Sequence, residues 1–213
     1  MNKKTLITAI ITSGGKSERF GSNKLLAKIG NYSVIETTIS KFIDKVDEII
    51  IPAAEETKEF ILNSKIFTDK IHIVPAGSTR QESVYNALRE CKNCDIVLIH
   101  DGARPFISKN TIDKAIEMTK QYKAVVVGKM AVDTIKTVEN GKIVNTLDRN
   151  KIFHAQTPQC FEFNLIKNIH EKYKNQPDFT DDSSMVEAEN IQPAILIAES
   201  KNDKITLKED IPV

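Results

Sequence analysis

The chain has 213 residues, with 30 Lys and Arg against 29 Asp and Glu, so its formal net charge is only +1. A charge this close to zero excludes the strong global field that gathers nucleic acid or an anionic membrane surface. The apolar residues fall in short runs, well below the ~20 needed to span a bilayer, and there is no charged-then-apolar leader. We therefore expect a cytoplasmic protein in which residues 1–213 form one domain, with neither nucleic acid nor membrane as a partner.

Short apolar runs alternate along the chain with segments of helical period. β-Branched runs bounded by turn residues predict buried strands, and apolar residues spaced three and four apart predict helices. Runs that are apolar on both faces indicate a mostly parallel sheet covered by helices on both sides, an α/β fold. The predicted strands are 5–11, 46–51, 71–74, 96–99, 124–127 and 194–198, and the predicted helices are 34–42, 55–62, 80–91, 111–120 and 163–173.

Residues 131–150 depart from this alternation of strand and helix patterns. The segment alternates in polarity and contains Asn140-Gly141 between two β-type stretches, which is a strong hairpin signal. Because the hairpin is too polar for a core, we expect it to project from the body. It is then either an exposed excursion or an arm that grips another subunit.

The three cysteines argue against a disulfide framework and for a reducing compartment. Cys91 and Cys94 form a C-x-x-C, but a structural zinc site needs about four ligands and Cys160 stands alone. We interpret the pair as ordinary thiols. The four histidines have no metal-ligand spacing, and no Ser or Cys has an obvious activating base, which excludes a zinc hydrolase and covalent catalysis.

The loop after the first strand is rich in glycine and basic residues. Ser13, Gly14 and Gly15 allow backbone N–H groups to approach an anion, and Arg19 and Lys24 are able to neutralise phosphates. The loop matches neither a Walker P-loop nor a dinucleotide-binding fingerprint. It is a candidate triphosphate cradle, and the alternative is a plain solvated turn.

A second candidate loop, His100-Asp101-Gly102-Ala103-Arg104, follows the strand predicted at 96–99. Ligands of such sheets bind at the carboxyl ends of the strands. Asp101 is there well placed to hold Mg²⁺ beside a polyphosphate, and Arg104 to clamp a phosphate. The alternative is an Asp–Arg pair that fixes a turn.

The segment from Gly77 to Ser83 follows another predicted strand and opens a helix. Its free N–H groups and hydroxyls are suited to reading a base edge or a ribose. Capping of the helix by Ser78 or Thr79 is an alternative that is compatible with such a role. Two further polar clusters, at residues 154–159 and 202–206, are expected near strand ends.

These segments, in this order, resemble the 2-C-methyl-D-erythritol 4-phosphate cytidylyltransferases of the non-mevalonate isoprenoid pathway. The resemblance covers nearly the whole chain. It implies a Rossmann-like fold of the nucleotidyltransferase type, with a projecting β-hairpin arm at about 131–150. The matching segments are the glycine-rich loop with Arg19 and Lys24, residues 77–83, 100–105, 133–134, 147–150, 154–159 and 204–206.

The resemblance also implies roles for single residues. Arg19, Lys24, Arg149 and Lys204 are then catalytic, the first two by stabilising the α-phosphate of CTP. The arm of a homodimer delivers Thr134 and Arg149 to the acceptor in the neighbouring subunit's site. Mg²⁺ or another divalent cation is implied at Asp101. The implied nucleotide-binding residues are Ser13, Gly14, Gly15, Gly77, Ser78, Arg80, Ser83 and Gly102, and the implied acceptor-binding residues are Asp101, Arg104, Thr134, Arg149 and Thr157.

The implied reaction is CMP transfer from CTP to 2-C-methyl-D-erythritol 4-phosphate, with release of pyrophosphate. A ribitol-5-phosphate cytidylyltransferase is the closest rival, and the segments around Thr134, Arg149 and Asp101 favour the methylerythritol type. A catalytically silent nucleotide-binding protein is a second alternative. Cationic residues converging on one phosphorus speak against it, because a protein that only binds has less need of them.

Overall fold

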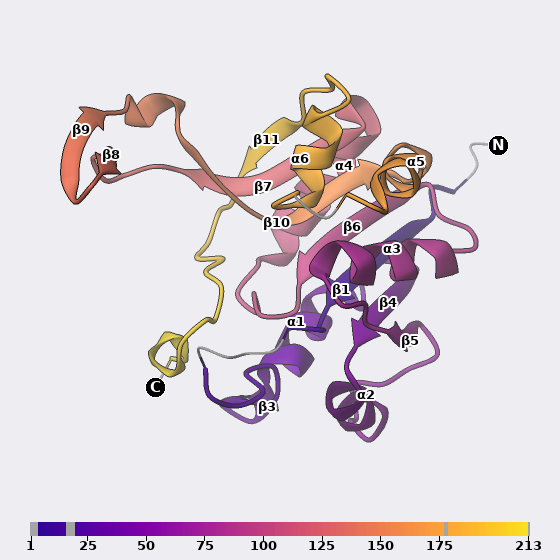
Figure 1. Cartoon of the computed structure of the whole chain (residues 1–213). Coiled ribbons are helices and arrows are strands. Elements are labelled where there is room, and N and C mark those ends of the chain that lie inside the picture. Colours follow the sequence, from indigo (N-terminus) through magenta and orange to yellow (C-terminus); the bar gives the residue numbers. More distant parts are fainter. Residues whose placement is uncertain (1–3, 16–19, 177–178, 213) are drawn as a thin grey trace.

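A computed structural model describes residues 4–15, 20–176 and 179–212 of the chain. Its centre is a seven-stranded sheet with the spatial order β11-β7-β10-β6-β1-β4-β5 (Figure 1). Every neighbouring pair is parallel except the two that involve β10, which runs antiparallel to both β6 and β7. The strands are β1 Ile7–Thr12, β4 Glu48–Ala53, β5 Ile71–Pro75, β6 Ile96–Asp101, β7 Ala124–Met130, β10 Phe153–Glu162 and β11 Ala194–Ile197.

Helices cover both faces of the sheet, so the predicted α/β architecture is confirmed. Alternate residues of β1 point to opposite sides: Ala9 and Ile11 join one apolar cluster with α1, α2 and α4, and Ile10 joins another with α3, α5 and α6. The helices are α1 Val34–Phe42, α2 Glu55–Leu62, α3 Arg80–Glu90, α4 Lys109–Tyr122, α5 Phe163–Tyr173 and α6 Asp182–Glu187. Two 3₁₀ turns, η1 Arg149–Lys151 and η2 Lys208–Asp210, and a short ribbon of β2 Lys28–Ile29 and β3 Tyr32–Ser33 complete the elements.

Strand β10 differs from the sequence-based expectation. Residues 154–159 were expected as a polar cluster near a strand end, yet they lie inside a ten-residue strand in the middle of the sheet. Gln156, Thr157 and Gln159 are buried there. Thr157 and Gln159 satisfy part of their hydrogen-bonding capacity through the end of β6 and the start of the helix Asp182–Glu187, which allows polar side chains in a central strand.

The predicted hairpin is present as a separate two-stranded ribbon, β8 Lys136–Glu139 and β9 Lys142–Thr146. Asn140 and Gly141 turn the chain with positive φ angles of 49° and 76°, as the Asn-Gly signal predicts. Figure 1 shows the hairpin projecting from the body beyond the end of β7. Within the part of the chain that the structure describes, no helix is long and apolar enough to cross a membrane.

Candidate functional site

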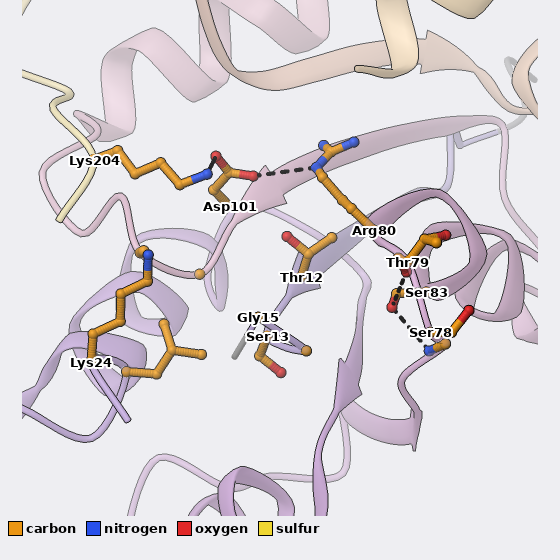
Figure 2. A pocket seen from close by; sticks show the side chains of 15 residues that line it. Thr12, Ser13, Gly15, Lys24, Ser78, Thr79, Arg80, Ser83, Asp101 and Lys204 are labelled. Carbon is orange, nitrogen blue, oxygen red and sulfur yellow. Dashed lines mark hydrogen bonds and ion pairs between the residues drawn. The ribbon is translucent and has the colours of Figure 1, made fainter. Parts of the chain in front are cut away.

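A pocket of about 430 Å³ opens where β1 and β6 end (Figure 2). The two strands are parallel neighbours, and their register pairs Thr12 with Asp101, so the loops that follow them meet at one edge of the sheet. The amino-terminal end of α3 closes another side. The lining residues are Thr12, Ser13, Gly14, Gly15, Lys24, Leu25, Gly77, Ser78, Thr79, Arg80, Ser83, Asp101, Gly102, Ala103 and Lys204.

Asp101 is the centre of a cluster of cations. Its Oδ2 lies 2.9 Å from Lys204 Nζ and 3.3 Å from Arg104 Nε, and its Oδ1 lies 3.6 Å from Arg80 Nε. Figure 2 shows Lys204 and Arg80 approaching the carboxylate from opposite sides. Burial would raise the pKa of Asp101, but the charges of Lys204, Arg80 and Arg104 outweigh it and hold that pKa well below its usual value.

Arg80 has a second carboxylate partner that sequence reasoning missed. Its Nη2 lies 2.8 Å from Asp182 Oδ2, and Asp182 Oδ1 lies 3.0 Å from His170 Nε2. Burial would lower the pKa of Arg80, but Asp182 and Asp101 raise it. Arg80 is therefore a charged bridge between the pocket and α6, held by two carboxylates.

A chain of hydrogen bonds holds the carboxyl end of β6, where Asp101 is the last residue. The Asp101 N–H donates to Thr157 Oγ1 at 3.0 Å, and Thr157 Oγ1 lies 3.1 Å from His100 Nδ1. His100 Nε2 lies 3.0 Å from the Arg104 carbonyl oxygen, which only accepts, so Nε2 carries the proton. Burial lowers the pKa of His100 to about 4, so the ring is neutral at pH 7 and its role here is structural.

Most of the sequence-predicted site residues lie together in the pocket. Arg104 and Thr157 contact Asp101 but are not among the lining residues, while Thr134 and Arg149 belong to the arm segment and do not line the pocket either. Arg19 lies outside the described residues. The predicted residues that line the pocket are Ser13, Gly14, Gly15, Lys24, Gly77, Ser78, Arg80, Ser83, Asp101, Gly102 and Lys204.

The single carboxylate of the described pocket lining suits a metal ion that arrives with phosphates. No group of three or more His, Cys, Asp or Glu side chains among residues 4–15, 20–176 and 179–212 is arranged to hold a metal by itself. Asp101 is the one carboxylate in the described pocket lining. Mg²⁺ is commonly held by one or two carboxylates together with substrate phosphates, so the donor set fits a metal–nucleotide complex.

The cysteines take no part in the site. Cys91, Cys94 and Cys160 are free thiols, as the sequence indicated. Burial raises the pKa of all three, that of Cys94 to about 11, so at neutral pH they are protonated and poorly nucleophilic.

The fold and the pocket together define an α/β protein of the nucleotidyltransferase type. A family model described as IspD, 2-C-methyl-D-erythritol 4-phosphate cytidylyltransferase, matches residues 7–213. Proteins of that name from Clostridioides difficile and Clostridium beijerinckii are each 40% identical to the chain; the alignments cover 98% and 97% of it, and 92% and 95% of the relatives. The chain therefore belongs to the 2-C-methyl-D-erythritol 4-phosphate cytidylyltransferase family.

Solved structures agree with this assignment. The 4-diphosphocytidyl-2C-methyl-D-erythritol synthase of Anaerococcus prevotii superposes with a TM-score of 0.86 at 30% identity, covering 97% of this chain and 95% of that one. The 2-C-methyl-D-erythritol 4-phosphate cytidylyltransferase of Francisella tularensis gives a TM-score of 0.82 at 32% identity, with 97% of each chain covered.

Proposed function

We propose that the chain transfers CMP from CTP to 2-C-methyl-D-erythritol 4-phosphate, giving 4-diphosphocytidyl-2-C-methyl-D-erythritol and pyrophosphate in isoprenoid precursor biosynthesis. Family membership supports the substrates. The observation that carries the chemistry is the convergence of Lys24, Arg80 and Lys204 on one pocket beside Asp101. Such a pocket suits a triphosphate much better than a neutral ligand.

The proposed mechanism needs positive charge and positioning, not a strong base. The acceptor's phosphate monoester is largely ionised at neutral pH, and its oxygen attacks the α-phosphorus of CTP in line while pyrophosphate leaves. Lys24 and Lys204 stabilise the charge that develops there, and the family resemblance implies the same task for Arg19. Ser13, Gly14 and Gly15 hold the phosphates, and the segment from Gly77 to Ser83 holds the base.

A divalent cation, Mg²⁺ or another, belongs to the proposed reaction. Asp101 is the residue that would hold it, together with phosphate oxygens of CTP. When bound, the ion neutralises phosphate charge and supports the leaving pyrophosphate. Lys204 and Arg80 already hold the Asp101 carboxylate from two sides, so its position does not depend on the metal.

The proposal includes a homodimer in which the arms exchange between subunits. Val138, Ile143 and Val144 of the hairpin are exposed, an apolar surface that suits a second copy of this chain. Thr134 and Arg149 lie on the arm segment and do not line the pocket, which supports their assignment to the acceptor in the neighbouring site. Arg104 and Thr157, both in contact with Asp101, are assigned to the acceptor side of the chain's own site.

Two organisational features complete the proposal. The seven-stranded sheet takes strands from β1 at Ile7 to β11 at Ile197, which supports a single domain over 1–213 with the arm as its projection. The three free cysteines fit a reducing compartment and hence the cytoplasm.

The proposed reaction is tested by measuring pyrophosphate release from CTP and Mg²⁺, with 2-C-methyl-D-erythritol 4-phosphate or ribitol 5-phosphate as acceptor at matched concentrations. We expect faster release with the methylerythritol substrate. Faster release with ribitol phosphate would assign the chain to ribitol-5-phosphate cytidylyltransfer. No release with either acceptor would indicate a catalytically silent nucleotide-binding protein.

A further inference from the structure

Glu82 does not line the pocket, but it accepts hydrogen bonds from the adjacent loop of Gly77 and Ser78. The backbone N–H and the hydroxyl of Ser78 both donate to Glu82 Oε2, each at 2.6 Å. These hydrogen bonds from Ser78 lower the pKa of Glu82, so the side chain is a carboxylate that only accepts. Both donors of Ser78 are therefore directed to the helix and not to the pocket.

The preceding residue is held in a similar way from the other side. The Gly77 N–H donates to Ser83 Oγ at 3.0 Å, and the Ser83 hydroxyl donates to the Thr79 carbonyl at 2.8 Å, as the dashed lines in Figure 2 show. Glu82 also packs across Gly77, because a Cβ built there would lie 2.4 Å from Glu82 Cγ. Position 77 thus admits no side chain while Glu82 keeps this position.

These contacts engage the N–H groups of Gly77 and Ser78 and the hydroxyl of Ser78, so what these two residues still offer to a ligand is their carbonyl oxygens and the lone pairs of the hydroxyl. Cytosine and uracil differ at position 3 of the ring, an acceptor nitrogen in cytosine and an N–H donor in uracil, and at position 4, an amino donor in cytosine and an oxygen acceptor in uracil. Acceptors that face position 4 pair with the amino group of cytosine and leave the oxygen of uracil without a partner. An unpaired buried polar group is costly, so this difference discriminates between the two bases.

We propose that Glu82 is a specificity-determining positioning residue, which makes the loop of Gly77 and Ser78 accept hydrogen bonds and thereby favours a 4-amino pyrimidine nucleotide over a 4-oxo one. This inference rests on the proposed function, since it places the base beside that loop. Glu82 acts through Ser78 and Gly77 and makes no contact with the base itself.

The test compares kcat/KM for CTP and UTP in the wild type and three variants. Glu82→Ala frees the N–H and hydroxyl of Ser78 for the oxygen of uracil, so we expect the CTP preference to fall about tenfold or more. Glu82→Gln keeps an acceptor oxygen of the same reach and should retain most of the preference. Glu90→Ala removes an exposed carboxylate at the far end of α3 and should leave the preference unchanged.

Equal loss of CTP and UTP turnover in Glu82→Ala, with the preference intact, would overturn the inference while the proposed function stands. If the wild type shows no transfer at all, the proposed function fails, and the ratio of CTP to UTP affinity, measured by calorimetry, still tests Glu82. Thermal melts report whether each variant is folded. Should Glu82→Ala not fold, Ser83→Ala, which frees the Gly77 N–H, is expected to lower the same ratio, and an unchanged ratio there contradicts the inference.

Discussion

Asp101 is buried, yet its pKa is held well below the usual value, so it carries a full negative charge. Lys204, Arg80 and Arg104 make that possible, because a buried carboxylate without cationic partners would be neutralised by protonation. Two of these cations, Lys204 and Arg80, also line the pocket that the phosphates of CTP would enter. At this scale the pocket is a small set of charges whose positions each depend on the others.

Lys204→Gln is expected to lower kcat/KM for CTP by a factor of about 10², because one preorganised cation near the reacting phosphate is lost. Steady-state kinetics of pyrophosphate release measures this. Lys208→Gln, a matched change in the exposed turn η2, should have no such effect. A Lys204→Gln variant within about twofold of wild type would remove this residue from the catalytic assignment.

At the scale of elements, α6 is tied to the site through one ion pair. Asp182 is the first residue of this helix, and its carboxylate lies between Arg80 of α3 and His170 of α5. Gln159 of β10 donates to the capping residue Asp181 at 2.6 Å, which fixes the start of α6 against the sheet. Three helices therefore meet at a buried polar junction behind the pocket.

Asp182→Asn is expected to lower the free energy of unfolding by about 3 kcal/mol. This value is at the low end for a broken buried ion pair, because Arg80 retains its ion pair with Asp101. Urea unfolding measures it, with Glu187→Gln at the exposed end of α6 as the control. A decrease in the free energy of unfolding below about 1 kcal/mol would show that the junction contributes little to stability.

The same junction sets a pH dependence. Burial would raise the pKa of Asp182, but Arg80 and His170 outweigh it and lower the pKa to about 2 from an unperturbed 3.8. The stabilisation is therefore fully present above the unfolded-state pKa and is lost as the pH falls from about 4 through 2. The free energy of unfolding of the wild type should fall more steeply with decreasing pH between about 4 and 2. In Asp182→Asn, the contribution of this residue to that pH dependence should be absent.

The sequence predicted the elements with strong periodicity and missed those that tertiary contacts create. Helices α1 and α2 have the expected bounds, α1 because its apolar periodicity coincides with a capping box of Ser33 and Glu36, and α2 from periodicity without a side-chain cap. Strand β10 was not predicted because three of its buried side chains, Gln156, Thr157 and Gln159, are polar and interrupt the apolar pattern. The pocket residues were predictable because they follow strand ends, whereas Asp182 joins Arg80 only when helices remote in sequence pack together.

At the scale of the whole molecule, the arm segment exposes large apolar side chains in a single copy of the chain. Val132 and Ile143 are 77% and 65% exposed, values at which an apolar side chain contributes little to the fold of its own subunit. Arg149 of the arm segment donates to the Val132 carbonyl at 2.7 Å, within its own segment. In the proposed homodimer, a second copy of the chain would pack against these exposed side chains.

A complementation experiment tests the shared sites. Arg149→Ala and Lys204→Gln should each be nearly inactive alone, and Arg149→Ala should impair use of the acceptor far more than binding of CTP. Mixed in equal amounts and allowed to exchange subunits, they should regain about a quarter of wild-type activity, since half of the dimers are mixed and each has one intact site. No recovery, with exchange verified by mass, would mean that Arg149 serves its own subunit; a monomeric mass in sedimentation would exclude the dimer.

The position of β10 in the sheet has a consequence for how the chain reaches its final form. Strands β1, β4, β5 and β6 come from the first 101 residues and are contiguous in space, so they are able to pair as soon as they have been synthesised. Strand β7 has no neighbour among them; β10 must be made before β7 and β11 are joined to the rest. During translation, the apolar strand β7 therefore stays unpaired until β10 has been completed at residue 162. A chaperone that binds the chain in this interval would protect β7 from aggregation.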